Sequence, residues 1–148
     1  MIEINNLTTV SIDGEFLKKV AEKVLEKENK KDSDLSIALV GQGRIRELNK
    51  MYRGENRVTD VLAFPGEITK KGKFTFPLEK IAGLGEIVIC LREVKKNAKN
   101  FDSTFEKELA QVLIHGILHL LGYDHEKSEE KAKEMEKKQQ YYLSLIKS

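Results

Sequence analysis

Apolar residues recur along the chain with two spacings, which predict an alternation of strands and helices. Residues 13–29 carry apolar side chains three or four positions apart with Lys and Glu between them, so we expect an amphipathic helix. Residues 44–53 return to the same helical spacing. Short apolar runs predict strands, because a strand buries alternate or successive side chains. These runs are residues 35–40, 61–64 (before Pro65) and 85–91, with one or two further short strands within residues 2–12.

The best-marked helix lies in the second half of the chain. Ser103 followed by Glu106 matches a capping box, in which side chain and backbone satisfy each other's free N–H groups. From Leu109 to Leu121 the segment is apolar on nearly every face, so we expect this helix to be central and buried. Gly122 marks its end, since glycine adopts the left-handed conformation without steric cost.

The other segments are more polar. Residues 92–100 are basic and weakly helical, and residues 66–83 hold glycines, a proline and a lysine cluster that predict a long loop or hairpin. Residues 126–146 predict a last helix. Five Lys and five Glu among residues 126–138 are typical of a solvated, self-paired face. Four apolar residues can form its inner stripe: Ala132, Met135, Leu143 and Ile146.

Composition places the chain among ordinary globular proteins. Its 148 residues predict one domain over residues 1–148, and 40% apolar residues exclude a disordered or collagen-like chain. A net charge of +2 neither requires nor excludes a nucleic-acid partner. The one cysteine, Cys90, lies in an apolar run and is expected to be a buried structural thiol. We find no signal peptide and no membrane-spanning stretch, and we expect a cytoplasmic protein.

Candidate chemistry is concentrated in one string, HGILHLLGYDH, which holds all three histidines of the chain. His115 and His119 are four residues apart, so they share a helix face and can grip one ion. Gly122 ends the helix, and the chain can then bring His125 back toward that ion. Three neutral imidazoles and one open position are typical of a catalytic zinc site, in which Zn²⁺ lowers the pKa of bound water to about 7. The alternative is that these are ordinary buried histidines satisfied by hydrogen bonds.

The histidine spacing matches that of metzincin metalloproteases, with one difference. Those proteases carry a glutamate, the general base, directly after the first histidine, and Gly116 stands there in this chain. The glycine can reflect close helix packing or room left for a substrate. No other base is evident, because Glu106 and Glu108 lie two turns upstream. Asp124 can either orient a ligand imidazole or act as a turn residue.

A second segment of interest is basic. Residues 44–80 contain nine basic and five acidic residues, which favours an anionic substrate. Arg53 is expected to end a helix and Arg57 to follow in a loop; the arginine fork suits phosphate better than a peptide carbonyl. The alternative is a solvated surface in which Arg53 caps its helix. Thr59 and Asp60 form either a strand-entry pair or part of a substrate site.

Together these blocks resemble the YbeY family of bacterial rRNA-maturation endoribonucleases. The resemblance rests on HGILHLLGYDH, on YR followed by TDVLAFP, and on GEIVI, and it covers about residues 48–125. The family more often has TDVLSFP and GDI. Ala63 here replaces the serine, which removes any role for a hydroxyl at that position. Glu86 replaces the aspartate, which keeps the charge.

The resemblance implies an α+β fold, with a small, mostly parallel mixed sheet flanked by helices and the histidines on a buried central helix. It implies one metal ion, usually assigned as zinc, held by His115, His119 and His125, with Arg53 as the functional arginine. It also implies cleavage of single-stranded RNA, 3′-end maturation of small-subunit ribosomal RNA and ribosome quality control, and hence ribosomal partners.

These inferences combine into a hypothesis of metal-assisted phosphodiester hydrolysis. The metal would polarise a phosphoryl oxygen and supply hydroxide, and Arg53 would neutralise charge in the transition state. Two alternatives stay open at this point: a zinc-dependent peptidase or amidase, and a non-catalytic ribosome assembly factor whose metal is structural.

Overall fold

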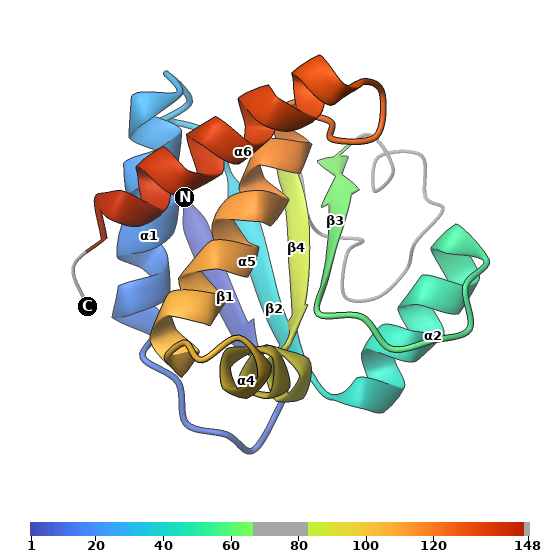
Figure 1. Cartoon of the computed structure of the whole chain (residues 1–148). Helices are drawn as coiled ribbons and strands as arrows, with labels where there is room; N and C mark the ends of the chain where they lie inside the picture. Colours follow the sequence, from blue (N-terminus) through green and yellow to red (C-terminus); the bar gives the residue numbers. More distant parts are fainter. Residues whose placement is uncertain (67–82, 147–148) are drawn as a thin grey trace.

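Four strands form one mixed sheet at the centre of the computed structural model, which describes residues 1–66 and 83–146 (Figure 1). They are β1 (Ile2–Asn6), β2 (Leu35–Val40), β3 (Val61–Pro65) and β4 (Gly85–Cys90), in the spatial order β1-β2-β4-β3. β1 and β4 each pair parallel with β2, and β3 pairs antiparallel with β4. The expected mostly parallel mixed sheet is therefore confirmed.

The two central strands are the ones that the sequence marks as continuous apolar runs. Every residue of β2 and β4 is buried, because both strands have a neighbour on each side and are covered on both faces. β3 is an edge strand, so Pro65 can belong to it without the loss of a ladder hydrogen bond. Residues 2–12 contain a single strand, β1.

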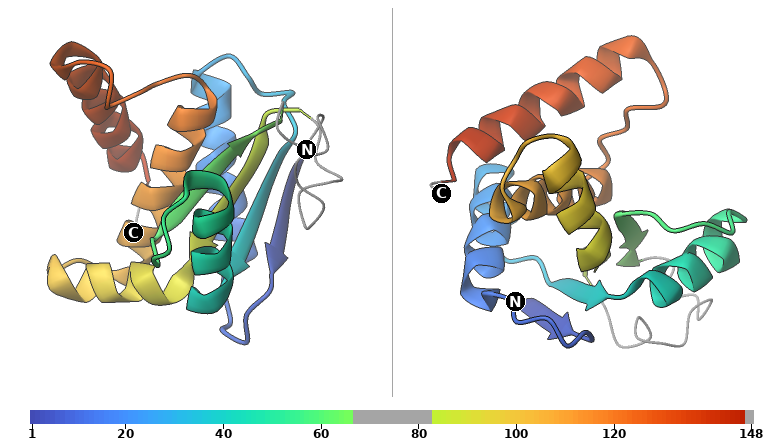
Figure 2. Two further views of the ribbon diagram at one scale, coloured as in Figure 1. Left: turned by 90° about the vertical axis from the view of Figure 1, so that its right-hand side faces the viewer. Right: turned by 60° about the horizontal axis from the view of Figure 1, so that its bottom comes forward.

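Five helices are described, and they cover the sheet unequally (Figure 2). Their bounds are α1 (Gly14–Lys27), α2 (Gln42–Arg53), α4 (Leu91–Asn100), α5 (Phe105–Leu120) and α6 (Glu129–Ser144). The larger hydrophobic cluster joins α1 and α5 to one face, which carries Ile37 and Ile87. A smaller cluster joins α2 to the other face, which carries Ala38 and Val88. α6 packs against α5 on the outer side of the first layer (Figure 1).

A side-chain cap fixes the N-terminus of α1 and another fixes that of α5. The start of α1 is fixed by Asp13, whose side chain accepts a hydrogen bond from the backbone N–H of Phe16. The expected capping box at Ser103 is wrong by one residue. Thr104 is the N-cap and accepts from the backbone N–H of Lys107, so Glu106 cannot occupy the reciprocal position.

Two further differences concern the polar segments. The last helix begins at Glu129 and not at residue 126, because the Ser128 hydroxyl accepts a hydrogen bond from Lys131 N–H and caps the helix there. The loop or hairpin expected at residues 66–83 lies almost wholly outside the described residues. Within the described ranges no helix is long and apolar enough to cross a membrane.

Helix α5 is central and buried, as expected, and one glycine sets how closely it approaches the sheet. A Cβ built on Gly116 would lie 3.0 Å from Cγ2 of Ile87 on β4, which is closer than ordinary van der Waals contact. Ile87 is completely buried and has little room to shift. The glycine is therefore explained by close packing of helix on sheet, and it fixes the height of α5 above the strands.

Candidate metal centre

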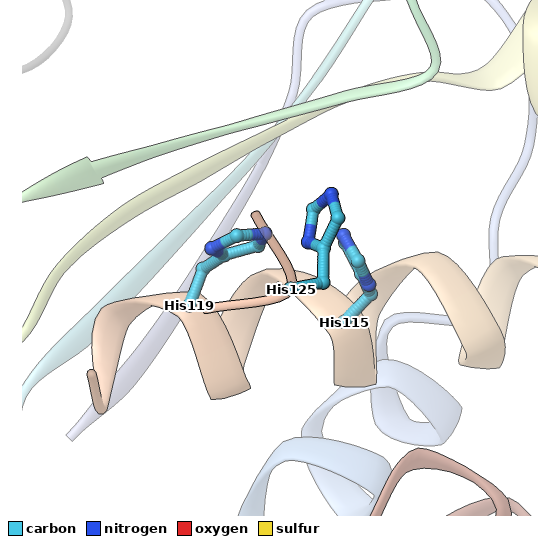
Figure 3. Close-up of side chains that lie close together, drawn as sticks. All are labelled: His115, His119 and His125. Atoms are coloured by element: carbon cyan, nitrogen blue, oxygen red, sulfur yellow. The ribbon is translucent and has the colours of Figure 1, made fainter. Parts of the chain in front are cut away.

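The three histidines converge at the C-terminal end of α5, where their rings gather on one side of the helix (Figure 3). One nitrogen from each ring can be chosen so that all three lie within 4.8 Å of one another. The centroids of the rings of His115 and His119 are 4.7 Å apart, and the ring of His125 lies 5.4 Å and 5.1 Å from them. His115 and His119 are half-buried and His125 is exposed. The sequence-predicted trio is thus brought together.

The return of His125 depends on the turn that follows α5. Gly122 adopts φ +100°, a conformation that L side chains rarely adopt, and the chain reverses there. The Tyr123 N–H donates to the carbonyl of Leu118 over 3.0 Å, which closes the end of the helix. Asp124 accepts a hydrogen bond from the Glu126 N–H over 2.8 Å, and this bond lowers the pKa of its carboxyl. Asp124 therefore acts as a turn residue.

Helix α6 provides a hydrogen-bond partner for the first histidine. The Nδ1–H of His115 donates to Oε1 of Gln139 over 2.9 Å, because an amide oxygen can only accept. This bond fixes the ring orientation and leaves the Nε2 lone pair of His115 for a ligand. Gln139 is only 7% exposed and His115 is half-buried, so the bond is partly shielded from water.

A second polar cluster links the turn that carries His125 to α1 and α6. The carboxylate of Glu28, directly after α1, accepts a hydrogen bond from Tyr123 over 2.9 Å and another from Tyr142 on α6. Lys138 donates to the same carboxylate over 3.2 Å. Burial alone would raise the pKa of Glu28, but these three donors outweigh it and lower the pKa. One ionised carboxylate therefore joins α1, α6 and the turn that carries His125.

The chemistry of the donor set fits a transition-metal ion. Burial lowers the pKa of His119, and the neighbouring His115 and His125 lower it further, so its ring is held neutral near physiological pH. Neutral imidazoles are ligands for Zn²⁺ and for several other first-row metals. Three such ligands on one wall of an open cavity leave space for water or substrate on the remaining side.

That cavity has a volume of about 800 Å³ and extends from the histidines along the edge strand. It is lined by residues from α2, β3, α4, α5 and α6 and from the segments just before β3 and just after α5. Thr59, Asp60 and Ala63, whose roles the sequence leaves open, all line it. Asp60 is held in place by the side-chain amide of Asn97, which donates to its carboxylate over 3.4 Å.

Arg53 is the one basic side chain of residues 44–66 that lines this cavity. It is the last residue of α2, and Gly54 (φ +69°) then ends the helix. Its side chain is exposed, and Arg53 lines the cavity together with residues of α5. Arg53 and the histidines, far apart in the sequence, therefore line the same space.

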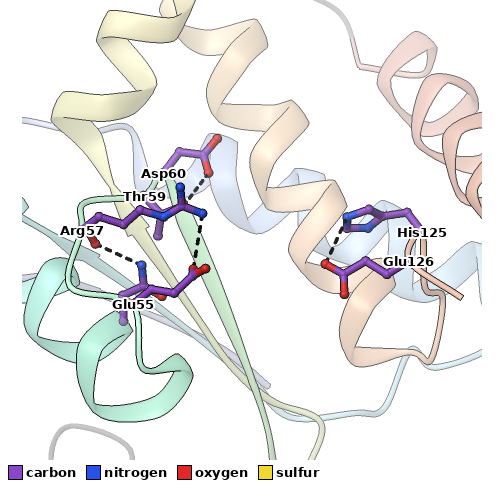
Figure 4. A network of polar contacts seen from close by, with 7 residues as sticks. Glu55, Arg57, Thr59, Asp60, His125 and Glu126 are labelled. Atoms are coloured by element: carbon purple, nitrogen blue, oxygen red, sulfur yellow. Dashed lines mark hydrogen bonds and ion pairs between the residues drawn. The ribbon is translucent and has the colours of Figure 1, made fainter.

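The other arginines of this region are engaged locally. Arg57 pairs with Glu55 over 3.4 Å (Figure 4), and Arg44 pairs with Glu47. Arg46 donates to Asn56 over 2.9 Å. The basic count over residues 44–80 therefore overstates the positive charge that faces the cavity. Residues 67–82 of this segment lie outside the described ranges.

Two carboxyl groups that the sequence left without a role are buried. Glu108 lines the cavity while Glu106 does not, and burial together with nearby Asp60 raises the pKa of Glu108. Glu86 is completely buried on the sheet face covered by α2. Burial raises its pKa to about 7, although Ser36 donates to it over 2.7 Å. Glu86 therefore keeps the negative charge of an aspartate only above that pH.

Sequence reasoning missed the supporting residues. Gln139 is absent from the predicted inner stripe of its helix because it is polar, although its spacing from Met135 and Tyr142 is helical and all three are buried. Glu28 and Tyr123 gave no signal, because their contact joins segments 95 residues apart. No periodic pattern reports a contact of that kind.

The comparisons with known proteins agree with this geometry. The sequence model of the family described as Endoribonuclease YbeY matches residues 3–147. A protein of that name from Thermotoga maritima is 44% identical over 132 residues, which cover 89% of this chain and 79% of the relative. A protein of the same name from Petrotoga mobilis is 40% identical over 146 residues, covering 97% and 94%.

A similar fold is known from a solved structure. The solution structure of TM1509 from Thermotoga maritima superposes with a TM-score of 0.66 at 42% sequence identity. The match covers 97% of this chain and 87% of that one. The similarity therefore extends beyond the histidine string to the whole described fold.

Proposed function

The chain belongs to the YbeY family of endoribonucleases, and we propose that it hydrolyses phosphodiester bonds of single-stranded RNA in the cavity beside the three histidines. One observation carries the proposal. Three imidazole nitrogens within 4.8 Å of one another line the same cavity as an exposed arginine at the end of another helix. A cation site and a guanidinium together suit a substrate that is a phosphate diester.

His115, His119 and His125 would hold the metal ion, and zinc is the ion that we propose. When bound, such an ion supplies a Lewis acid that polarises a phosphoryl oxygen and lowers the pKa of a water molecule. The residues of the chain set its position. The Gln139 carbonyl directs Nε2 of His115 outward, and the turn at Gly122 returns His125.

Arg53 would bind a non-bridging phosphate oxygen and counter the negative charge that grows during cleavage. The guanidinium is always protonated and offers two parallel donors, which match the geometry of a phosphate group. Its exposed side chain at the end of α2 allows the approach of a large substrate. Glu108 and Asp60 also line the cavity, and the raised pKa of Glu108 reduces the negative charge that these two side chains present to a phosphate.

The biological role that we propose is 3′-end maturation of small-subunit ribosomal RNA and ribosome quality control in the cytoplasm, with ribosomal components as partners. An RNA strand without secondary structure suits the site, since a single backbone can enter a cavity of about 800 Å³. A duplex is too wide to enter and would lie across the opening. Binding that rests on phosphate contacts should weaken as salt increases.

The structure gives no specific support to the peptidase or amidase alternative. A glutamate at position 116 would point its Cβ at Ile87 on β4, so the protease base cannot be restored by that route. A purely structural metal is also disfavoured, because the histidines face an open cavity and a closed set of four protein ligands is typical of structural zinc.

One experiment separates these functions. Metal-loaded protein is incubated with single-stranded RNA and, separately, with casein, with and without a chelator. We expect the RNA alone to be cleaved, the chelator to stop cleavage and added zinc to restore it. His115→Ala should lose metal and activity together, while Lys107→Ala, at an exposed position on the same helix, should lose neither. Cleavage of casein alone, or a folded metal-loaded protein inert toward RNA, would contradict the proposal.

A further inference from the structure

The cavity extends beyond the histidines to the junction of α4 and α5, where an aromatic side chain lies open to solvent. Phe101 is the residue directly after α4, held there by its N–H, which donates to the Asn97 carbonyl over 2.9 Å. Its side chain is 69% exposed and lines the same cavity as the three histidines. An aromatic ring left in water at the wall of a binding cavity is available to a ligand.

Phe101 differs from the other exposed apolar residues of the described chain. Single exposed apolar residues are normal on protein surfaces and need no functional explanation. Four other large ones beyond the N-terminal Met1 are exposed in this structure, and none of them lines the cavity: Leu7, Val10, Met51 and Tyr141. Phe101 is therefore distinguished from the other exposed apolar residues by its position in the cavity, and not by its exposure.

The surroundings of Phe101 suit a nucleotide more than a purely apolar ligand. Asn97, one helical turn earlier, and Gln111 on α5 line the cavity beside it and bring amide groups that can bond a base edge. The side-chain amide of Asn97 already donates one N–H to Asp60, and its side-chain oxygen remains available as an acceptor. The outer surface of α4 adds four exposed cations, which suit a phosphate backbone: Arg92, Lys95, Lys96 and Lys99.

We propose that Phe101 is the stacking platform of a nucleobase subsite for single-stranded RNA, with Asn97 at its edge. This inference rests on the proposed function and adds the place where a base is held. The subsite lies where α4 leads into α5. Glu108 is the first residue of α5 that lines the cavity, and it precedes His115 by seven residues, about 10 Å along the helix axis. The stacked base therefore belongs to a nucleotide other than the one whose phosphate is cleaved.

Stacking on Phe101 is expected to contribute to binding and not to chemistry. Base–aromatic stacking is sequence-tolerant, because every base offers a π-face, so the subsite would select an unpaired base over a paired one. A base in a duplex is covered on both faces and cannot use the ring. The subsite thus gives a physical reason for a preference for single strands.

The chain lends itself to a direct test, because it contains no tryptophan. Phe101→Trp places a single tryptophan at the subsite, and its fluorescence is titrated with a short single-stranded RNA. We expect the RNA to quench the emission, and an abasic oligonucleotide of equal length to leave it unchanged. Equal quenching by both oligonucleotides, or none by either while the RNA binds, would overturn the stacking role.

Kinetics supply the second measurement. Phe101→Ala should raise KM for single-stranded RNA about five- to a hundredfold with kcat nearly unchanged, and Phe101→Tyr should restore KM. Tyr141→Ala, an exposed aromatic on α6 outside the cavity, is the matched control and should change neither constant.

The failure of this proposal can be distinguished from failure of the proposed function. Wild-type protein that cleaves RNA, together with a Phe101→Ala variant of unchanged KM, would overturn the subsite and leave the nuclease function intact. Wild-type protein that neither binds nor cleaves single-stranded RNA would overturn both.

Discussion

Tyr123 donates its hydroxyl to the carboxylate of Glu28 over 2.9 Å, across 95 residues of chain. Tyr123 lies between the second and third histidines, in the turn that brings His125 back. The bond to Glu28 therefore anchors this turn to the end of α1. Because Glu28 also accepts from Tyr142 and Lys138 on α6, the same carboxylate anchors the helix that carries Gln139. The geometry of the site therefore depends on a contact that no candidate ligand makes directly.

Tyr123→Phe removes this hydroxyl and is expected to weaken metal binding several-fold. The turn loses one hydrogen bond to an ionised acceptor, which costs about 1.5–3 kcal/mol when the bond is buried and less where water can replace it. The measurement is competition for Zn²⁺ or Co²⁺ against a chromophoric chelator. Tyr141→Phe, an exposed tyrosine of α6, should bind metal as the wild type does. Unchanged affinity in Tyr123→Phe would show that the turn holds without Glu28.

Gln139→Leu is expected to lower metal affinity about ten- to a hundredfold, because the Nδ1–H of His115 loses its acceptor and the ring is free to turn. Gln139→Glu should preserve affinity, since a carboxylate accepts the same bond. The control is Gln140→Leu, at an exposed position whose amide donates to Glu136. A Gln139→Leu variant that binds metal like the wild type would remove the orienting role from Gln139.

Arg53→Ala is expected to retain the metal and to lose at least about a hundredfold in kcat, the scale found when one group that stabilises transition-state charge is removed. Arg53→Lys should recover part of the loss, because charge returns without the planar fork. Metal content by elemental analysis and cleavage rates on single-stranded RNA provide the two measurements. Arg46→Ala, whose side chain bonds Asn56 outside the cavity, is the control. Wild-type cleavage by Arg53→Ala would contradict the role.

The buried Glu86 predicts a pH dependence of stability. Its pKa is about 7 in the folded chain, against 4.5 for the free group, so the folded state holds the proton more tightly. The free energy of unfolding should therefore fall as pH rises from about 4.5 to 7 and level off above, by roughly 3 kcal/mol at most from this group. Below that window both states are protonated and the contribution is constant.

The test of Glu86 compares denaturant unfolding of wild type and Glu86→Gln across this pH range, with chelator present so that metal binding does not contribute. The difference between the two proteins isolates Glu86 from the histidines, which also titrate. Glu22→Gln, at an exposed position on α1, should follow the wild-type curve. If the free energies of unfolding of wild type and Glu86→Gln ran parallel with pH, the pKa of Glu86 would be the same in the folded and unfolded chain. That result would contradict the raised pKa.

Gly116→Ala should be destabilising, although alanine favours a helix by about 1 kcal/mol over glycine. The new Cβ would meet three atoms of Ile87 at 3.0–3.3 Å, and such overpacking typically costs about 1–3 kcal/mol. Combining it with Ile87→Ala should give a smaller loss than the sum of the single changes in a double-mutant cycle. Gly14→Ala, where the added group meets open space, is the control. Additive losses would show that the two positions do not interact.

The strands, the amphipathic helices and the convergence of the three histidines could all be predicted from the sequence, because each is recorded in local spacing. His115 and His119 are one helical turn apart, and Gly122 announces the reversal that returns His125. Local spacing also misled. Ser103 with Glu106 matched the capping-box pattern, yet the helix is capped by Thr104, whose third following residue is Lys107.

What the sequence could not provide is the set of contacts between distant segments. Arg53 ends α2 and the histidines lie at and after the end of α5, and only the folded chain brings them to one cavity. The basic count around Arg53 favoured an anionic substrate, but Arg57 is paired with Glu55 and does not line the cavity. A charged residue shows its available charge only once its partners are known.

The close fit of Gly116 against Ile87 also sets how many substitutions separate this chain from the pattern of the metalloproteases with the same histidine spacing. Glutamate at position 116 would bring its Cβ within 3.0 Å of Ile87, a completely buried residue of the sheet. The residue at position 87 would have to become smaller as well. Conversion of one pattern into the other therefore takes at least two coupled substitutions.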